Sequence, residues 1–142
     1  MAEQITQFVM NNPVLATAWL AVACALAWTI KATAAGGARV TPAQATRLIN
    51  SEDAVVLDVR PDSEFKDGHI LNATNIALSD LSTQMGKLER YKGRPVITAC
   101  RSGQQSHTAA GVLRKAGFEK VYNLAGGIVA WQDASLPLSK KK

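Results

Sequence analysis

Cysteine, histidine and clustered charge are all scarce in this sequence. Its 142 residues include two cysteines, Cys24 and Cys100, which lie far apart in different surroundings, so we expect reduced thiols and no disulfide framework. The two histidines, His69 and His107, are also separated, and with Cys100 they give no spacing typical of metal ligands. These absences exclude a disulfide-stapled scaffold and leave a metal site unsupported.

Basic residues are present, but they are not grouped in a way that suits nucleic acid. The formal net charge is +5, yet the lysines and arginines between Arg39 and Lys120 are scattered and interleaved with acids, and they form no basic stripe. We therefore expect no nucleic-acid partner. Residues 139–142 form a basic tail that ends in three lysines. We interpret it as solvated, with a weak attraction to an anionic membrane of about 1 kcal/mol per lysine.

Charge is absent altogether from Pro13 to Ile30. These 18 residues would extend about 27 Å as a helix, close to the hydrocarbon thickness of a bilayer. We therefore expect a short N-terminal segment at residues 1–12, followed by a transmembrane helix and tether at residues 13–35. The small residues from Ala32 to Ala38 are expected to end the helix and form the tether.

A cleaved secretory signal is the competing interpretation, because Ala32–Ala34 look like a small-residue cleavage site. It is disfavoured because the residues before Pro13 contain Glu3 and neither lysine nor arginine, and because Lys31 lies where a cleavage region is normally uncharged. Every lysine and arginine follows the apolar run. The positive-inside rule then predicts a single-pass protein with its N-terminus outside and the following domain in the cytoplasm.

The rest of the sequence alternates between β-branched apolar runs and segments with helical periodicity. The expected strands are Ala54–Val59, a short one around Ile76, Pro95–Ala99 and Lys120–Leu124. The expected helices run from Thr41-Pro42 to Asn50, over Leu78–Leu88, within Gly103–Gly117, and over a short closing segment that includes Trp131. This order predicts an α/β fold with an open, mainly parallel sheet flanked by helices.

Cys100 follows one of these strands directly, just before a helix is expected to begin. In open α/β sheets, reacting groups gather beyond the carboxyl ends of the strands. The loop after Cys100 can curl so that its N–H groups converge on the sulfur and favour a thiolate. Gly103 permits such a curl, and Ser106 can cap the helix or donate to the sulfur. On these residues alone, a buried core cysteine remains the alternative.

Two long stretches resemble the rhodanese-like sulfurtransferase family. "VVLDVRPDSEFKDGHILNATNIALSDL" is similar to the family's N-terminal signature, and "ITACRSGQQSHTAAGVLRKAGFEKVYNLAGGIVAW" to its active-site segment and C-terminal signature. The matching residues, in order and spacing, are Asp58, Arg60, Glu64, Phe65, Gly68, His69, Ile70, Ala73, Asn75, Ile76, Gly126, Gly127 and Trp131. The resemblance implies a rhodanese-like domain at residues 38–138. The layout is similar to small single-pass rhodanese-like proteins of bacterial inner membranes.

The resemblance also implies a reaction. Cys100 would take sulfane sulfur from a small donor such as thiosulfate or a persulfide, and the Cys100 persulfide would pass it to a thiol or other nucleophilic acceptor. No metal or organic cofactor is implied. The implied substrate-binding loop consists of Arg101, Ser102, Gly103, Gln104, Gln105 and Ser106. Its amides would hold the persulfide, and Arg101 would attract an anionic donor.

Three signature residues are expected to support this site: Asp58, Arg60 and Glu64. Arg60 is expected to brace the loop after the first buried strand or to pair with Glu64. His69 is expected to fix a turn through a hydrogen bond. Many active relatives carry a second basic residue where this chain has Gln105, so thiosulfate is expected to be a poor donor.

Two other functions fit parts of the pattern. A rhodanese fold with an idle or weakly active Cys100 would serve as an interaction module that docks to a membrane protein partner. A cysteine-dependent phosphatase is disfavoured, because that chemistry needs an arginine after five intervening residues, where this chain has Ser106.

Overall fold

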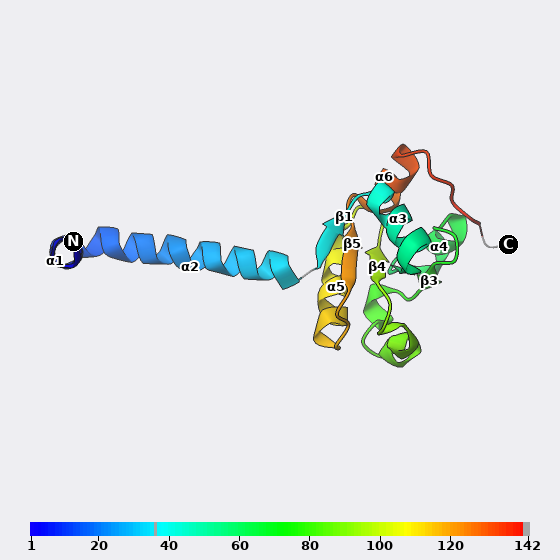
Figure 1. Cartoon of the computed structure of the whole chain (residues 1–142), viewed down its shortest axis with the longest axis horizontal. Coiled ribbons are helices and arrows are strands. Elements are labelled where there is room, and N and C mark those ends of the chain that lie inside the picture. The colour runs from blue at the N-terminus through cyan, green and yellow to red at the C-terminus, as the bar shows by residue number, and fades with distance from the viewer. Residues whose placement is uncertain (36, 141–142) are drawn as a thin grey trace. The chain divides into compact units, whose positions relative to one another are not determined.

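The computed structural model describes residues 1–35 and 37–140. The chain divides into two compact units, Met1–Ala34 and Ala35–Lys142. The first contains helices only, and the second contains the sheet with its covering helices (Figure 1).

The first unit consists of α1 (Ala2–Asn11) and α2 (Pro13–Ala35). They are separated at Asn12, because the residue before a proline is disfavoured in the helical conformation and Pro13 suits the first helical turn. Residues Pro13–Ile30 of α2 are long and apolar enough to cross a membrane, and none of this stretch is buried in the structure. The helix continues to Ala35, so the part of the predicted tether at residues 32–35 is helical, and Gly36 lies outside the described residues.

The second unit is built on a five-stranded sheet in the order β1-β5-β4-β2-β3. Every neighbouring pair is parallel. The strands are β1 (Ala38–Val40), β2 (Val55–Asp58), β3 (Thr74–Asn75), β4 (Val96–Ala99) and β5 (Val121–Leu124). The predicted parallel α/β sheet is thus confirmed. The strand β1 was not predicted, because three residues are too few to show a pattern and its pairing with β5 is long-range.

Helices cover both faces of this sheet (Figure 1). One core lies under α5 (Gln104–Lys115) and the 3₁₀-helices η1 (Leu78–Asp80) and η2 (Met85–Tyr91), and it includes Leu57 and Leu113. The other includes Ala45 of α3 (Pro42–Glu52) and Trp131 of α6 (Gly127–Asp133). The remaining helix named here, α4 (Asp62–Asp67), follows β2.

Two helical predictions have different outcomes. The start of α3 is confirmed: the amide of Gln44 donates to Thr41 Oγ1 over 3.3 Å, and the amide of Thr41 donates to Gln44 Oε1 over 2.9 Å. The single helix expected over Leu78–Leu88 is wrong, since η1 and η2 form there with a turn between them. In that turn the hydroxyl of Thr83 donates to the carbonyl oxygen of Asp80 over 2.9 Å, a local bond that competes with helix continuation.

Candidate active site

The side chain of Cys100 takes its direction from the alternation along β4. Val96 and Cys100 belong to the core beneath α5, whereas Ile97 and Ala99 belong to the core on the opposite face. The sulfur therefore lies on the α5 side of the sheet, just beyond the carboxyl end of a central strand. Cys100 is only 2% exposed.

The loop after Cys100 surrounds the sulfur with donors. The Gly103 amide donates to Cys100 Sγ over 3.0 Å, and the hydroxyl of Ser106 lies 3.2 Å from the same atom. Gly103 has φ +95°, a left-handed conformation that glycine adopts readily, and its turn brings this amide back to the sulfur.

These donors set the ionisation of the thiol. Burial alone would raise the pKa of Cys100, but hydrogen bonds from the Ser106 hydroxyl and from the amides of Ser106, Gly103 and Ser102 outweigh burial and lower the pKa. The amides belong to the loop and the first turn of α5, where the helix dipole also favours negative charge. The site can therefore stabilise a thiolate, or a persulfide anion attached to the same sulfur.

A buried amide on the neighbouring strand holds this loop in place. Asn123 of β5 is 1% exposed; its Nδ2 donates to the Gly103 carbonyl oxygen over 3.0 Å, and its Oδ1 accepts from the Ser106 hydroxyl over 2.6 Å. Asn123 thus contacts Gly103 and Ser106, two of the residues whose donors reach Cys100. It was missed at the sequence level, although a lone amide in the apolar run "KVYNL" is the signal that could have revealed it.

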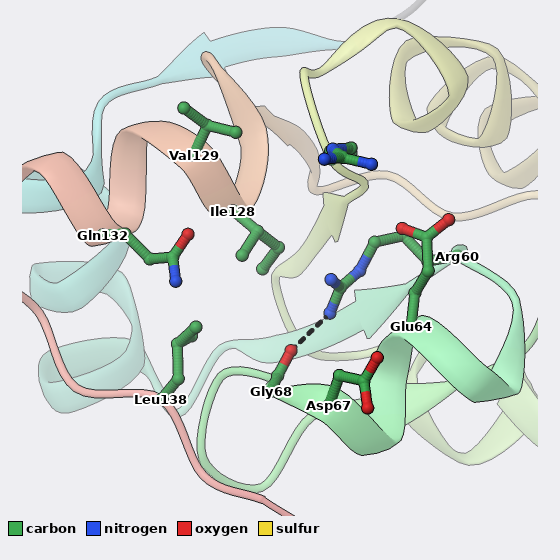
Figure 2. Close-up of a pocket in the computed structure, with 9 residues that line it drawn as sticks. Arg60, Glu64, Asp67, Gly68, Ile128, Val129, Gln132 and Leu138 are labelled. Atoms are coloured by element: carbon green, nitrogen blue, oxygen red, sulfur yellow. Dashed lines mark hydrogen bonds between the residues drawn. The ribbon is translucent and has the colours of Figure 1, made fainter.

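The carboxyl end of β2 carries a separate buried network. Arg60 donates from Nε to Asp58 Oδ1 over 3.0 Å and from Nη2 to Asp58 Oδ2 over 2.7 Å. The same Nη2 donates to the Gly68 carbonyl oxygen over 2.7 Å (Figure 2). Arg60 therefore ties the end of β2 to the turn after α4. Its ion-pair partner is Asp58, so the alternative expectation of a pair with Glu64 is wrong.

The turn that Arg60 contacts is also held by His69. The ring Nδ1 of His69 lies 2.8 Å from the Phe65 carbonyl oxygen, which can only accept, so Nδ1 carries the proton. The His69 ring stacks on the Phe65 ring with centroids 3.8 Å apart. The expected turn-fixing hydrogen bond of His69 is thus present.

Helix α6 packs directly against the active-site loop. The amide of Ile128 donates to the Cys100 carbonyl oxygen over 2.9 Å, and the amide of Val129 donates to the Arg101 carbonyl oxygen over 3.3 Å. Gly127 makes this approach possible, since a Cβ built there would lie 2.6 Å from the carbonyl carbon of Arg101. Gly127 of the C-terminal signature thus belongs to the support of the loop.

Beside the loop lies a cavity of about 270 Å³ (Figure 2). The structure brings the candidate residues Arg60, Glu64 and Arg101 together in its lining. Figure 2 shows Glu64 and Asp67 on the α4 side and Val129 and Gln132 on α6. The loop residues Ser102, Gln104 and Gln105 are exposed. Within residues 1–35 and 37–140, no three cysteine, histidine or acidic side chains gather as a metal site would require.

The fold and the site together define a class of protein. It is a small parallel α/β domain whose cysteine lies inside a loop of converging amides. Residues 41–134 match the sequence model of the Rhodanese-like domain, and the chain belongs to this family. An "Uncharacterized protein YibN" of Escherichia coli K12 is 40% identical over 142 residues and is covered over 99% of both chains.

Two further relatives connect the domain to named activities and solved folds. The "Thiosulfate sulfurtransferase GlpE" of Pseudoalteromonas translucida is 35% identical over 95 residues, which are 67% of this chain and 89% of that protein. The crystal structure of a rhodanese-related protein from Thermoplasma volcanium has a TM-score of 0.67 and 27% identity, covering 73% of this chain and 99% of its own. The predicted family and fold are confirmed, whereas the roles of the individual loop residues stay predictions.

Proposed function

We infer that this protein is a membrane-anchored sulfurtransferase that carries sulfane sulfur on Cys100. The observation that supports it most directly is the set of donors around Cys100 Sγ, which lowers the pKa of the thiol despite its burial. A core cysteine has no need of such donors, because a neutral thiol packs well among apolar groups.

The transfer consists of two displacements at sulfur. The Cys100 thiolate attacks the outer sulfur of a persulfide R–S–SH, so that Cys100–S–SH forms and R–S⁻ leaves. With thiosulfate as the donor, sulfite would leave instead. An acceptor thiolate then attacks the terminal sulfur of Cys100–S–SH and regenerates the Cys100 thiolate. The inward-facing amides would stabilise the Cys100 thiolate that starts the first step and that the second step regenerates.

Mass spectrometry of the full chain tests this proposal. Incubation with glutathione persulfide, in detergent and in a Cys24→Ser background, should add one sulfur atom to the protein. The added mass should disappear with a thiol acceptor and be absent from Cys100→Ser. If neither persulfide nor thiosulfate loads Cys100, the alternative of a rhodanese-fold module that docks to a membrane protein partner is favoured, consistent with the near-complete burial of the sulfur.

The proposed location is a bacterial inner membrane, with the domain in the cytoplasm. It is supported by the apolar stretch Pro13–Ile30 of α2 and by the absence of lysine and arginine before Lys31. Protease added to intact spheroplasts should leave the domain uncut, as judged by an immunoblot against a C-terminal epitope, and should digest it once the membrane is opened. Digestion in intact spheroplasts would reverse the proposed orientation.

A further inference from the structure

The cavity beside the active-site loop is lined by both positively and negatively charged side chains. The transfer reaction proposed above gives the negative ones no role. The cavity is lined by the free carboxylates of Glu64 and Asp67, the guanidinium of Arg101, the amide of Gln132, and the apolar side chains of Ile128 and Leu138. The volume of about 270 Å³ lies just below the range for drug-sized ligands, so it suits a small metabolite.

The charges in this cavity are unequal. The guanidinium of Arg60 also reaches the cavity, but the buried carboxylate of Asp58 already neutralises it. The side chains of Glu64, Asp67 and Arg101 form no ion pair with any residue in the described part of the chain. One free cation and two free anions therefore face a ligand, and an anion without a positive group would meet net repulsion.

The cavity borders the backbone next to Cys100, and Cys100 itself is not in its lining. Arg101 follows Cys100 directly, and Ile128 donates its amide to the Cys100 carbonyl oxygen over 2.9 Å. Glu64 and Asp67 lie three residues apart on α4, so they project from neighbouring positions of one helix face. Figure 2 shows both carboxylates on the α4 side of the cavity, with Ile128 across from them.

We propose that this cavity selects, as the sulfur acceptor, a small zwitterionic thiol of the amino-acid type. Its ammonium group is bound by Glu64 and Asp67, its carboxylate by Arg101, and its short carbon chain by Ile128 and Leu138. This inference rests on the proposed sulfur transfer for its chemistry, but not for its binding. The acceptor thiolate attacks the outer sulfur of Cys100–S–SH, the sulfur–sulfur bond to Cys100 breaks, and the electron pair stays on Cys100 as the thiolate.

Acceptor kinetics on preloaded protein test the charge preference. Four thiols are compared: cysteine, cysteamine without a carboxylate, and N-acetylcysteine and 3-mercaptopropionate without an ammonium group. Each thiol is given to the wild-type chain and to the double variant Glu64→Gln, Asp67→Asn, and the ratio of the two rate constants cancels the intrinsic reactivity of the thiol. The ratio should be about three- to tenfold in favour of wild type for the two ammonium thiols and below one for the other two.

Two further variants sharpen this experiment. Arg101→Gln should lower the rate of transfer to cysteine more than the rate of transfer to cysteamine, because of these two thiols only cysteine carries a carboxylate for Arg101 to bind. Asp62→Asn is the matched control: its carboxylate lies on the same helix but pairs with Lys66 and does not line the cavity, so all four ratios should stay near one. Equal ratios for all four thiols in the Glu64, Asp67 double variant would overturn the proposal.

A binding measurement separates this inference from the proposed function. S-methylcysteine keeps both charges but accepts no sulfur, so its binding does not depend on a Cys100 persulfide. Titration into the full chain should shift the amide resonances of Gly68, Ile128 and Val129, and the N-acetyl derivative should bind at least threefold more weakly. Equal binding of the two compounds would refute the charge preference even if Cys100 carries sulfur, and selective binding would uphold it even if Cys100 does not.

Discussion

The carboxyl ends of β2 and β4 both carry buried polar groups, yet the two networks are closed in different ways. At β2, the Asp58 carboxylate is matched by a full positive charge on Arg60, with contacts from Nε and Nη2. At β4, Cys100 Sγ faces amide and hydroxyl donors that carry no formal charge. In the first arrangement the charges of Asp58 and Arg60 neutralise each other. In the second, the donors stabilise a negative charge on the Cys100 sulfur without neutralising it. We therefore interpret the β2 end, where full charges are paired, as structural, and the β4 end, where dipoles surround the sulfur, as the proposed reactive end.

The largest effect on stability is expected from removing the buried ion pair at the carboxyl end of β2. Asp58→Ala leaves the buried Arg60 charge without its ion-pair partner, which should lower the free energy of unfolding by about 3–5 kcal/mol. The measurement is urea unfolding of the full chain in detergent, followed by Trp131 fluorescence in a Trp19→Phe, Trp28→Phe background.

Lys66→Ala provides the matched control for this prediction. Lys66 pairs with Asp62 over 2.6 Å, but both side chains are more than half exposed, so its loss should cost only about 0.2–0.5 kcal/mol. An equal effect of the two variants would mean that the Asp58–Arg60 pair does not hold the β2 end.

Ser106→Ala should have an intermediate effect on stability and a specific one on the thiol. It removes the hydroxyl that donates to the buried Asn123 Oδ1, at a cost of about 1–3 kcal/mol. The same hydroxyl has one proton, which it shares between Asn123 Oδ1 and Cys100 Sγ, so its loss should also let the pKa of Cys100 rise toward its ordinary value. The rate of iodoacetamide alkylation of Cys100 against pH, in a Cys24→Ser background, measures this change.

The lowered pKa also fixes the sign of a pH effect on stability. Between the folded and the unfolded pKa of Cys100, the unfolded chain binds a proton that the folded chain does not, so the free energy of unfolding rises with pH. This contribution is lost as the pH falls through the folded pKa, and Ser106→Ala should reduce it. Thr108→Ala, which removes an exposed hydroxyl from the same helix, should leave the alkylation profile unchanged. An unchanged profile in Ser106→Ala would mean that the hydroxyl donates to Asn123 alone.

The contrast between the two strand ends also explains what could be predicted from sequence. Cys100, Gly103 and Ser106 were recognisable because a strand, a cysteine and a helix start follow one another within a few residues. The cap at Thr41-Pro42 is local in the same way. Asn123 was missed because it meets the loop only through the pairing of β4 with β5, 20 residues after Gly103.

Arg60 shows an intermediate case. Its role in bracing was recognisable, but the choice between Asp58 and Glu64 depends on how the turn at Gly68 folds back. The charges around the cavity depend on the same kind of long-range placement, since α4, α6 and the loop after β4 all contribute to it. Local order therefore predicts the proposed nucleophile, and only the tertiary fold reveals the charged groups that line the cavity beside it.

The smallest effect is expected from adding a full positive charge near the carboxyl end of β4, and it concerns the rate of sulfur loading. Gln105 is exposed on the first turn of α5, and Gln105→Arg should raise the rate of loading from thiosulfate by about two- to fivefold, because an exposed ion pair contributes up to about 1 kcal/mol. The gain should shrink in high salt, since exposed charges are screened, and should be absent with a neutral persulfide donor. Persulfide formation on Cys100, followed by mass spectrometry at two salt concentrations, measures it. A gain that is the same for both donors would point to a change in the loop itself, whereas no gain with thiosulfate would show that loop charge does not limit the reaction.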